Sequence, residues 1–354
     1  MMDKIKRLFK YSWSAVLSVS LLLVSSACSS ENDEPIPAPQ DPTPQIIVMY
    51  GPSGLGDQGY MDCILTGVQN FKCAHYSDAD MYQYSPSTME EAERLVNDWL
   101  SLPLSNIPAL FVVASSDYEA LITEALSQHS LTDNKRMLMF ENDVTLDLPI
   151  TIFQMSMYGA SYLAGVTAAE YVKTLEEDAV RKDALILLAH PNDRTIARAG
   201  AGFQDGFDSV GLDAKAFTEY LAEDWTGYAS AQIAYQRMSK WSKSYSFVFP
   251  VAGGSNQGIF RYTREYPDSP LTAGMDVDQS GLSRNITGSV IKHIDKVVYD
   301  FMEMWLTTGE LPESTVFGLE SGYVDWVLSP KYKQYQQIVD AARQEAIRKE
   351  ASEL

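Results

Sequence analysis

Short apolar runs alternate with segments of helical period from residue 46 onward, and this alternation constrains the fold more than any other feature. Parallel strands that are buried on both faces are continuous apolar runs, and each needs a crossover helix to reach its neighbour. The expected strands are 46–50, 109–114, 136–140, 184–189, 214–222, 245–252 and 271–275. The expected helices are 88–100, 118–128, 160–176, 195–210, 228–238, 288–307 and 332–350. The chain is therefore predicted to be an α/β protein with mainly parallel sheets.

Small and polar residues follow several of these strands. Examples are Ser115-Ser116-Asp117, His190-Pro191-Asn192-Asp193 and Gly253-Gly254-Ser255-Asn256. In open α/β sheets, ligands bind outside the carboxyl ends of the strands. We therefore expect these loops, with Ser115 and the glycines 253 and 254 among them, to converge on a ligand cleft.

A glycine motif after the first strand supports one specific hypothesis. Gly54, Gly56 and Gly59 have the G-x-G-x-x-G spacing of a dinucleotide-binding turn, and Asp78 and Asp80 follow about twenty residues later, where such a site holds a ribose. An NAD-dependent enzyme is therefore one candidate function.

The first 44 residues predict an export signal and a membrane anchor. Four basic residues precede the ten-residue apolar run 15–24, which is too short to span a bilayer. The following Ser25-Ser26-Ala27-Cys28 resembles a bacterial lipobox. Residues 1–27 are therefore expected to be a lipoprotein signal peptide, with Cys28 as the lipidated first residue of the mature chain. This lipid anchor would place the protein in the cell envelope. Residues 28–44 are a proline-rich acidic tether. The acidic patch resembles an export signal for the outer cell surface, or it only solvates the linker.

The charge of the chain argues against nucleic acid as a partner. Removing residues 1–27 takes away four positive charges and one negative charge, so the formal charge of −20 becomes about −23. Nucleic acids bind most strongly to clusters of Lys and Arg, so a strongly acidic protein surface is a poor partner for them.

Motifs for catalysis, phosphate binding and metals are absent from the sequence. There is no G-x-S-x-G, no G-x-x-x-x-G-K-[ST] and no H-E-x-x-H, and the four histidines are scattered. Asp276 and Asp278 alternate along a strand and should point to opposite faces, so we expect no metal and no cofactor. Cys63 and Cys73 are about 15 Å apart if 61–71 is helical, which favours two buried free thiols over a disulfide.

Five local motifs, read in order, resemble the basic membrane protein family of nucleoside-binding lipoproteins. The motifs are Gly56-Asp57-Gln58-Gly59-Tyr60, Ala160-Ser161-Tyr162-Leu163-Ala164-Gly165, Ala252-Gly253-Gly254-Ser255, Gly274-Met275-Asp276-Val277-Asp278-Gln279, and Ser289-Val290-Ile291-Lys292 with Asp295 on a helix. The resemblance covers essentially the whole chain after the tether. It implies a type I periplasmic-binding-protein fold, with two Rossmann-like lobes of parallel sheet and a ligand cleft between them.

The chemistry of a nucleoside pocket, matched to these positions, suggests roles for individual residues. Asp57 and Asp276 would accept ribose hydroxyls, Lys292 would donate to them, and Gly253 and Gly254 would let the backbone approach the ligand. Tyr60 and Trp225 would sandwich a base between the lobes. Each has a structural alternative: Asp57 as a helix N-cap, Lys292 as a surface residue, and the aromatic residues as covers of the core.

Met61 departs from the family pattern, which usually has an asparagine there. A thioether cannot make the asparagine's polar contacts, although it packs well against flat rings. The stretch 153–158 also lacks an acidic residue that could recognise a base. Another small polar or aromatic-bearing ligand therefore remains an alternative to a nucleoside.

The sequence thus predicts a lipid-anchored solute-binding protein of an ABC-type uptake system. Hinge closure around a nucleoside-like ligand is the expected mechanism, with a permease as partner. Lobe one is expected to comprise 45–156 plus 283–308, and lobe two 157–282 plus 309–354. The alternatives are a ligand-sensing lipoprotein without transport and the NAD-dependent enzyme.

Overall fold

The computed structural model describes residues 42–104, 106–142, 144–176 and 179–353. The predicted signal peptide, the lipidation site Cys28 and most of the predicted tether lie outside these residues. Among the helices in the described ranges, none is both long enough and apolar enough to cross a bilayer.

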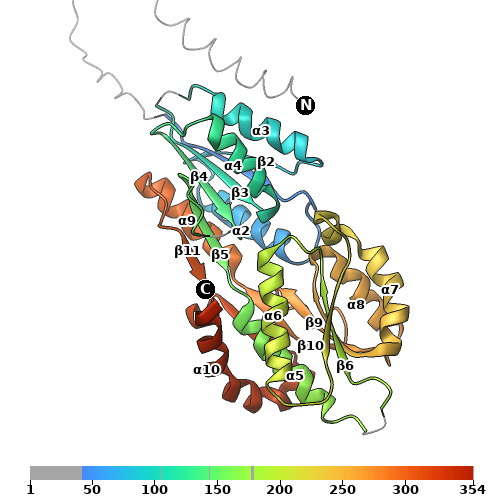
Figure 1. Ribbon diagram of the computed structural model, residues 1–354. Helices are drawn as coiled ribbons and strands as arrows, with labels where there is room; N and C mark the ends of the chain where they lie inside the picture. The colour runs from blue at the N-terminus through green and yellow to red at the C-terminus, as the bar shows by residue number, and fades with distance from the viewer. Residues whose placement is uncertain (1–41, 105, 143, 177–178, 354) are drawn as a thin grey trace, which may run out of the picture. The chain divides into compact units, whose positions relative to one another are not determined.

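The first lobe is built on a parallel six-stranded sheet (Figure 1). Its strand order is β11 (Thr315–Phe317), β5 (Thr151–Met155), β4 (Lys135–Phe140), β3 (Ala109–Ala114), β1 (Gln45–Tyr50) and β2 (Asp80–Tyr84). The central strand β3 is buried at every residue, because Leu110 and Val112 pack on one face while Phe111 and Val113 pack on the other.

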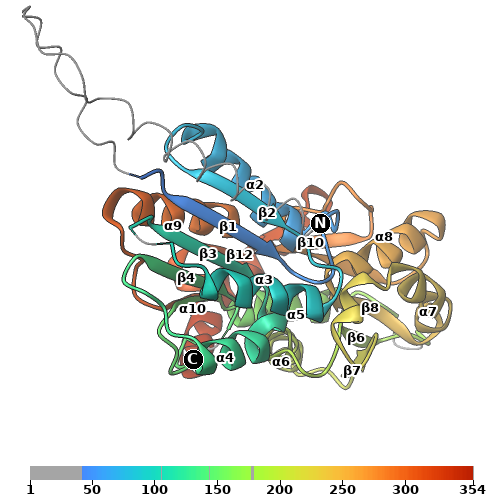
Figure 2. The same ribbon diagram turned by 90° about the horizontal axis from the view of Figure 1, so that it is seen from above.

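Helices cover both faces of this sheet. They are α2 (Tyr60–Ala74), α3 (Met89–Ser101), α4 (Glu119–Gln128) and α9 (Ile294–Thr308). In Figure 2, α2 and α9 lie on one side of β1 and β3, and α3 and α4 lie on the other. Gly67 of α2 allows α9 to approach closely, since an added Cβ would lie 2.4 Å from the carbonyl oxygen of Asp295.

The second lobe has a six-stranded sheet with one antiparallel edge. Its order is β12 (Val324–Leu328), β10 (Ile286–Lys292), β9 (Leu271–Asp276), β8 (Tyr245–Val251), β6 (Asp183–Leu188) and β7 (Ala216–Tyr220). Strand β12 runs antiparallel to β10, and the other pairs are parallel. The predicted α/β fold with two lobes of mainly parallel sheet is confirmed.

The helices of the second lobe are α5 (Tyr158–Val172), α6 (Arg194–Asp208), α7 (Ala231–Ser244), α8 (Asn256–Glu265) and α10 (Gln336–Glu353). Short 3-10 segments are 116–118, 225–229, 253–255, 319–321 and 330–335. Helices α5 and α6 pack backbone to backbone, because an added Cβ at Gly206 would lie 2.0 Å from the carbonyl oxygen of Tyr162. This packing fixes the N-terminus of α6 beside the cleft.

The chain crosses between the lobes three times, and two predicted boundaries are wrong. The crossings follow β5, β10 and β11. Strand β10 pairs with β9 and β12 in the second sheet, although 283–308 was assigned to lobe one. Strand β11 pairs with β5 in the first sheet, although 309–354 was assigned to lobe two.

The predicted helix 288–307 is also wrong in its first turn. Residues 286–292 form a strand, and α9 starts only at Ile294. The sequence ITGSVIK is rich in β-branched residues and is buried between two strands, which suits β structure better than a helix. Of the two predicted buried thiols, Cys63 is buried and Cys73 is exposed near the end of α2.

Candidate functional site

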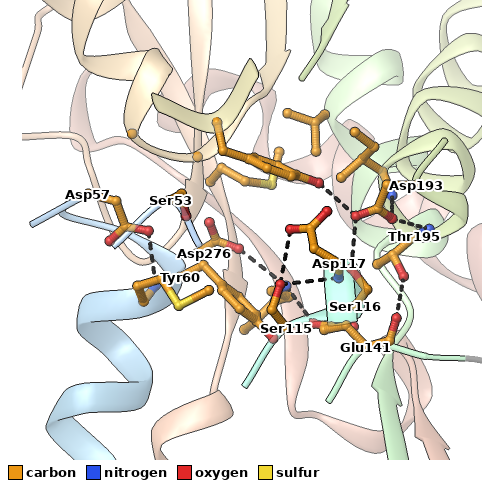
Figure 3. A pocket seen from close by; sticks show the side chains of 18 of the residues that line it. Ser53, Asp57, Tyr60, Ser115, Ser116, Asp117, Glu141, Asp193, Thr195 and Asp276 are labelled. Atoms are coloured by element: carbon orange, nitrogen blue, oxygen red, sulfur yellow. Dashed lines mark hydrogen bonds and ion pairs between the residues drawn. The ribbon is translucent and has the colours of Figure 1, made fainter. Parts of the chain in front are cut away.

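A cavity lies where the carboxyl ends of the two sheets face each other. The empty space between its lining atoms is about 620 Å³, open solvent included. In Figure 3, Asp57, Tyr60 and Asp276 lie on one side of this cavity, and Asp193 and Thr195 lie on the other. Eight of the nine predicted ligand-binding residues line it: Asp57, Tyr60, Met61, Ser115, Gly253, Gly254, Asp276 and Lys292. Their contacts with a ligand stay predictions.

A buried charged cluster forms one wall of the cavity. The Nζ atom of Lys292 lies 2.7 Å from Oε1 of Glu141 and 3.3 Å from Oδ1 of Asp276. All three residues are no more than 6% exposed. The cluster has two carboxylates and one ammonium group, so it presents a net negative charge together with several acceptor oxygens.

The pKa values in the cluster reflect this environment. Burial raises the pKa of Asp276. The Lys292 ammonium group opposes this rise, and the Glu141 carboxylate adds to it. Burial alone would lower the pKa of Lys292, but the two carboxylates outweigh burial and hold it above its usual range. Lys292 is therefore a permanent cation here, and it can donate to a ligand oxygen.

Two residues of this cluster have a strained backbone. Asp276 ends β9 and Glu141 directly follows β4, with φ angles of 70° and 60°, a left-handed conformation that is uncommon for residues other than glycine. This geometry turns each carboxylate from the end of its strand toward the cleft. Such strain is often found at functional sites.

Tyr60 opens helix α2 and has one face occupied. The Nζ atom of Lys292 lies 4.3 Å from the centre of its ring. Its hydroxyl is buried and has no hydrogen-bond partner in the part of the chain that the structure describes. Burial raises the pKa of this hydroxyl, so it is a neutral donor at physiological pH. A buried, unpaired donor beside a cavity is available to a ligand.

The Asp57 carboxylate accepts hydrogen bonds from amides at the start of helix α2, although the N-cap residue of this helix is Gly59 and not Asp57. Its Oδ1 accepts hydrogen bonds from the amides of Gly59 and Asp62, at 2.9 and 3.2 Å, and its Oδ2 accepts one from the amide of Met61 at 2.9 Å. Burial raises the pKa of Asp57, and these amides oppose the rise. These three bonds use most of the acceptor capacity of the carboxylate, and its contact with a ribose hydroxyl stays a prediction.

Tyr228, and not Trp225, provides an aromatic side chain from the second lobe. Trp225 starts the 3-10 turn 225–229 and is not among the cavity-lining residues, whereas Tyr228 in the same turn is. The Tyr228 hydroxyl donates to Oδ2 of Asp193 at 2.7 Å. Trp225 was predicted from its residue type, and the turn directs the ring of Tyr228 into the cavity in its place.

The lobes are in direct contact around the cavity. Ser116 donates to Oδ2 of Asp193 at 3.1 Å, and Thr195 donates to the carbonyl oxygen of Glu141 at 3.1 Å. On the opposite side, an added Cβ at Gly254 would lie 3.4 Å from Cβ of Asp57. The small size of Gly254 thus allows the two lobes to approach each other, and the arrangement is that of a closed cleft.

The remaining lining is largely sulfur and aliphatic carbon. Met61 and Met157 come from the first lobe and the first crossing, and Met275, Val251 and Ile196 come from the second lobe. Thioethers adapt to flat rings and make favourable contacts with aromatic groups. The cavity therefore joins a charged wall to an apolar, adaptable surface.

Several lining residues were not predicted from the sequence: Ser53, Ser116, Asp117, Glu141, Met157, Asp193, Thr195, Ile196, Tyr228, Val251 and Met275. Glu141 directly follows the predicted strand 136–140, so the rule for strand ends would have identified it. Asp117 and Asp193 lie in loops that the sequence did single out. In the described ranges, no group of three or more His, Cys, Asp or Glu residues is arranged to hold a metal ion.

Two α/β lobes joined by three crossings, with a polar cavity between the carboxyl ends of their sheets, define a type I periplasmic binding protein. A family model agrees with this class. Residues 45–353 match the model Bmp, described as ABC transporter substrate-binding protein PnrA-like, so the chain belongs to that family. No curated protein matches the chain.

Solved structures share this fold. A solute-binding protein of an ABC transporter system from Aeropyrum pernix K1 is 15% identical, with a TM-score of 0.69 over 87% of this chain and 92% of that one. A carbohydrate transporter solute-binding protein from Agrobacterium radiobacter, in complex with D-arabinose, is 16% identical, with a TM-score of 0.58 over 83% and 98%. A carbohydrate transporter from Acidothermus cellulolyticus 11B, in complex with myo-inositol, is 12% identical, with a TM-score of 0.57 over 87% and 99%. Identities this low establish the fold alone.

Proposed function

We propose that this protein is a lipid-anchored solute-binding protein of the bacterial cell envelope that binds a nucleoside or a closely related molecule and delivers it to an ABC permease. The observation that carries the proposal is the division of the closed cavity. One wall holds the buried charges of Lys292, Glu141 and Asp276, and tyrosine, methionine and aliphatic side chains supply an apolar surface beside the polar loop residues.

The charged wall suits the hydroxyls of a ribose. Adjacent hydroxyls are donors and acceptors at once, so they can donate to the carboxylates of Asp276 and Glu141 while they accept from Lys292. Hydrogen bonds to charged groups contribute about 1.5–3 kcal/mol each. A ligand without hydroxyls would leave this cluster with no partner for its free lone pairs.

The aromatic and apolar part of the lining suits a flat heterocycle. Tyr60 and Tyr228 approach from different lobes, and Met61, Met157 and Met275 supply adaptable apolar contacts. The unpaired Tyr60 hydroxyl offers one donor to a ring nitrogen or carbonyl oxygen. Met61 makes no polar contact with a base edge, so it favours shape over hydrogen bonding in recognising the ring.

Binding across the cleft explains how a ligand would signal occupancy to a permease. A molecule that contacts both lobes binds the closed state more tightly than the open one, so it shifts the hinge equilibrium toward closure. The predicted signal peptide and Cys28 support attachment to the membrane, where a permease would be within reach of the tether. Without a permease, the same pocket would serve a sensing lipoprotein.

Thermal-shift screening of the purified protein tests the ligand class. The panel contains purine and pyrimidine nucleosides, free bases, pentoses, hexoses, inositol and NAD. A ligand at a hundred times its dissociation constant adds about 2.7 kcal/mol to the unfolding free energy. A nucleoside is expected to raise the melting temperature. A shift with sugars alone would refute the nucleoside assignment, and a shift with NAD alone would revive the dinucleotide hypothesis.

A matched pair of variants locates the site. Asp276→Asn changes a buried carboxylate in the cavity, whereas Asp278→Asn changes an exposed carboxylate two residues further on. Asp276→Asn is expected to lose the ligand-induced shift, and Asp278→Asn to keep it. If both variants respond like the wild type, the ligand binds elsewhere.

The anchor is tested separately. Expression of the wild type in a bacterial host with a labelled fatty acid should label the protein and place it in the membrane fraction. Cys28→Ser should abolish both results. A labelled Cys28→Ser variant would contradict the proposed lipidation site.

A further inference from the structure

A second cavity adjoins the first at the mouth of the cleft. Its empty space is about 1190 Å³, open solvent included. Five residues line both cavities: Ser116, Asp117, Glu141, Asp193 and Thr195. The hydrogen bonds from Ser116 to Asp193 and from Thr195 to Glu141 therefore lie in the wall between the two cavities.

His190 presents an unused donor to the second cavity. It is 5% exposed, and its Nδ1 accepts a hydrogen bond from the amide of Asn192 at 3.3 Å, so in the neutral ring the proton is on Nε2. Nε2 is buried and has no hydrogen-bond partner among the described residues. Its nearest charged neighbour, Oδ1 of Asp117, is 3.6 Å away, beyond a hydrogen bond.

The charges around this cavity are nearly balanced. Glu119 lies 3.7 Å from Arg194, and Glu141 is paired with Lys292. Asp193 accepts four hydrogen bonds, two of them from the first turn of α6. The remaining charged groups are Asp117 and Arg198, which have opposite signs, and the Arg198 guanidinium donates to Oε1 of Gln154 at 3.1 Å.

The composition of the lining argues against two kinds of occupant. Ala120 is its one apolar residue and none of its residues is a Tyr, Phe or Trp, so the lining offers little apolar surface to a flat ring. Four carboxylates line the cavity beside two guanidinium groups, so the lining has no excess of positive charge that would attract a phosphate or a carboxylate. The available groups are donors, from His190 and Arg198, and an acceptor, Oδ1 of Asp117. A hydroxyl group meets these conditions, because it is uncharged and both donates and accepts hydrogen bonds.

We infer that the second cavity is a subsite for an uncharged, hydroxyl-rich substituent, such as a glycosyl group, on the molecule whose other part occupies the first cavity. The inference rests on the proposed function for the first part of the ligand. The substituent's hydroxyls donate to Asp117 and accept from His190 and Arg198. A ligand that spans the wall replaces the Ser116–Asp193 hydrogen bond with its own hydroxyl contacts.

Calorimetric titration with matched pairs of ligands tests this subsite. The pairs are adenosine and its O-ribosyl derivative, uridine and its O-glucosyl derivative, and glucose and maltose. For the parent compound that binds, the glycosylated partner should bind at least tenfold more tightly to the wild type. His190→Phe and Arg198→Met should each remove this advantage and leave the affinity for the parent unchanged. Arg261→Met, an exposed change on α8, is the control.

The outcomes separate the two proposals. Nucleoside binding without a gain from glycosylation, or a gain that survives in both variants, overturns the subsite and leaves the proposed function standing. If only the sugar pair shows a gain in affinity, with maltose bound more tightly than glucose, and both His190→Phe and Arg198→Met lose this gain, the subsite is supported and the nucleoside assignment is removed. If no member of any pair binds, both proposals fail.

Discussion

Glu350 is expected to hold two of the three crossings together from the C-terminal helix. Its side chain is buried, with 3% of the residue exposed. Oε1 accepts hydrogen bonds from the Ser156 hydroxyl at 2.7 Å and the Gly159 amide at 2.9 Å, at the first crossing. Oε2 accepts a hydrogen bond from the Leu319 amide at 2.7 Å, at the third crossing. One carboxylate therefore links segments that must rearrange together when the lobes open.

The size of the effect follows from these three bonds. A hydrogen bond to a charged group contributes about 1.5–3 kcal/mol, and such contributions within one network are not additive. Glu350→Ala leaves two buried amides and a hydroxyl without an acceptor, so we expect a loss of about 3–5 kcal/mol in unfolding free energy. Glu350→Gln keeps one carbonyl oxygen but places an NH₂ group near at least one donor, so a loss of about 1–3 kcal/mol is expected.

Urea denaturation measures the stability loss, and small-angle X-ray scattering of the ligand-free protein measures the lobe opening. Both variants should unfold at lower urea concentration, and Glu350→Ala should have a larger radius of gyration because the crossings are no longer tied. Glu345→Ala on the same helix, which breaks an exposed pair with Arg348, is the control. If Glu350→Ala is as stable and as compact as that control, the carboxylate does not hold the crossings.

Three other changes test the structure at separate places. Lys135 is buried and donates to the carbonyl oxygens of Trp99, Leu100 and Leu102 at the end of α3, so Lys135→Met should lose about 2–4 kcal/mol in denaturant unfolding, and an unchanged midpoint would contradict this cap. His75 lies between Asp78 and Glu303; burial alone would lower its pKa, but the two carboxylates outweigh burial and raise it. The protonated ring thus stabilises the folded state fully below about pH 6.5, and this contribution is lost as pH rises through the higher folded pKa, so His75→Gln should flatten the stability curve there. Tyr60→Phe should keep the ligand-free melting temperature and weaken nucleoside binding about tenfold, since the hydroxyl has no partner within the described protein; equal affinity would show that it does not contact the ligand.

Local patterns predicted β1, β3, β4, β6, β8 and β9, because each is a mostly apolar run flanked by turn residues. They did not predict the interior strand β5, with the sequence TIFQM, in which Gln154 interrupts the apolar run. The edge strand β2, with the sequence DMYQY, is half-buried and lacks such a run. The predicted helix 288–307 overlaps strand β10, because the pairing of this strand with β9 and β12 depends on residues that are distant in sequence. Burial between neighbouring strands decided its conformation, and no local window contains that information.

The site was predictable to the extent that it follows strand ends. The loops after β1, β3, β4, β6 and β8 and the end of β9 reach the cavity, as the topology of a parallel sheet requires. The pairing of Glu141 with Lys292 joins residues 151 positions apart, so no local pattern indicates it. Trp225 and Tyr228 are in the same short turn, and only its three-dimensional geometry decides which ring faces the ligand.

The most direct test of the central claim is calorimetric titration of the wild type, Asp276→Asn and Asp278→Asn with a nucleoside. The account predicts saturable one-to-one binding to the wild type and to Asp278→Asn, and at least a tenfold loss of affinity in Asp276→Asn, which removes the charge beside Lys292. No binding of any nucleoside to the wild type, or equal affinity for all three proteins, would contradict it.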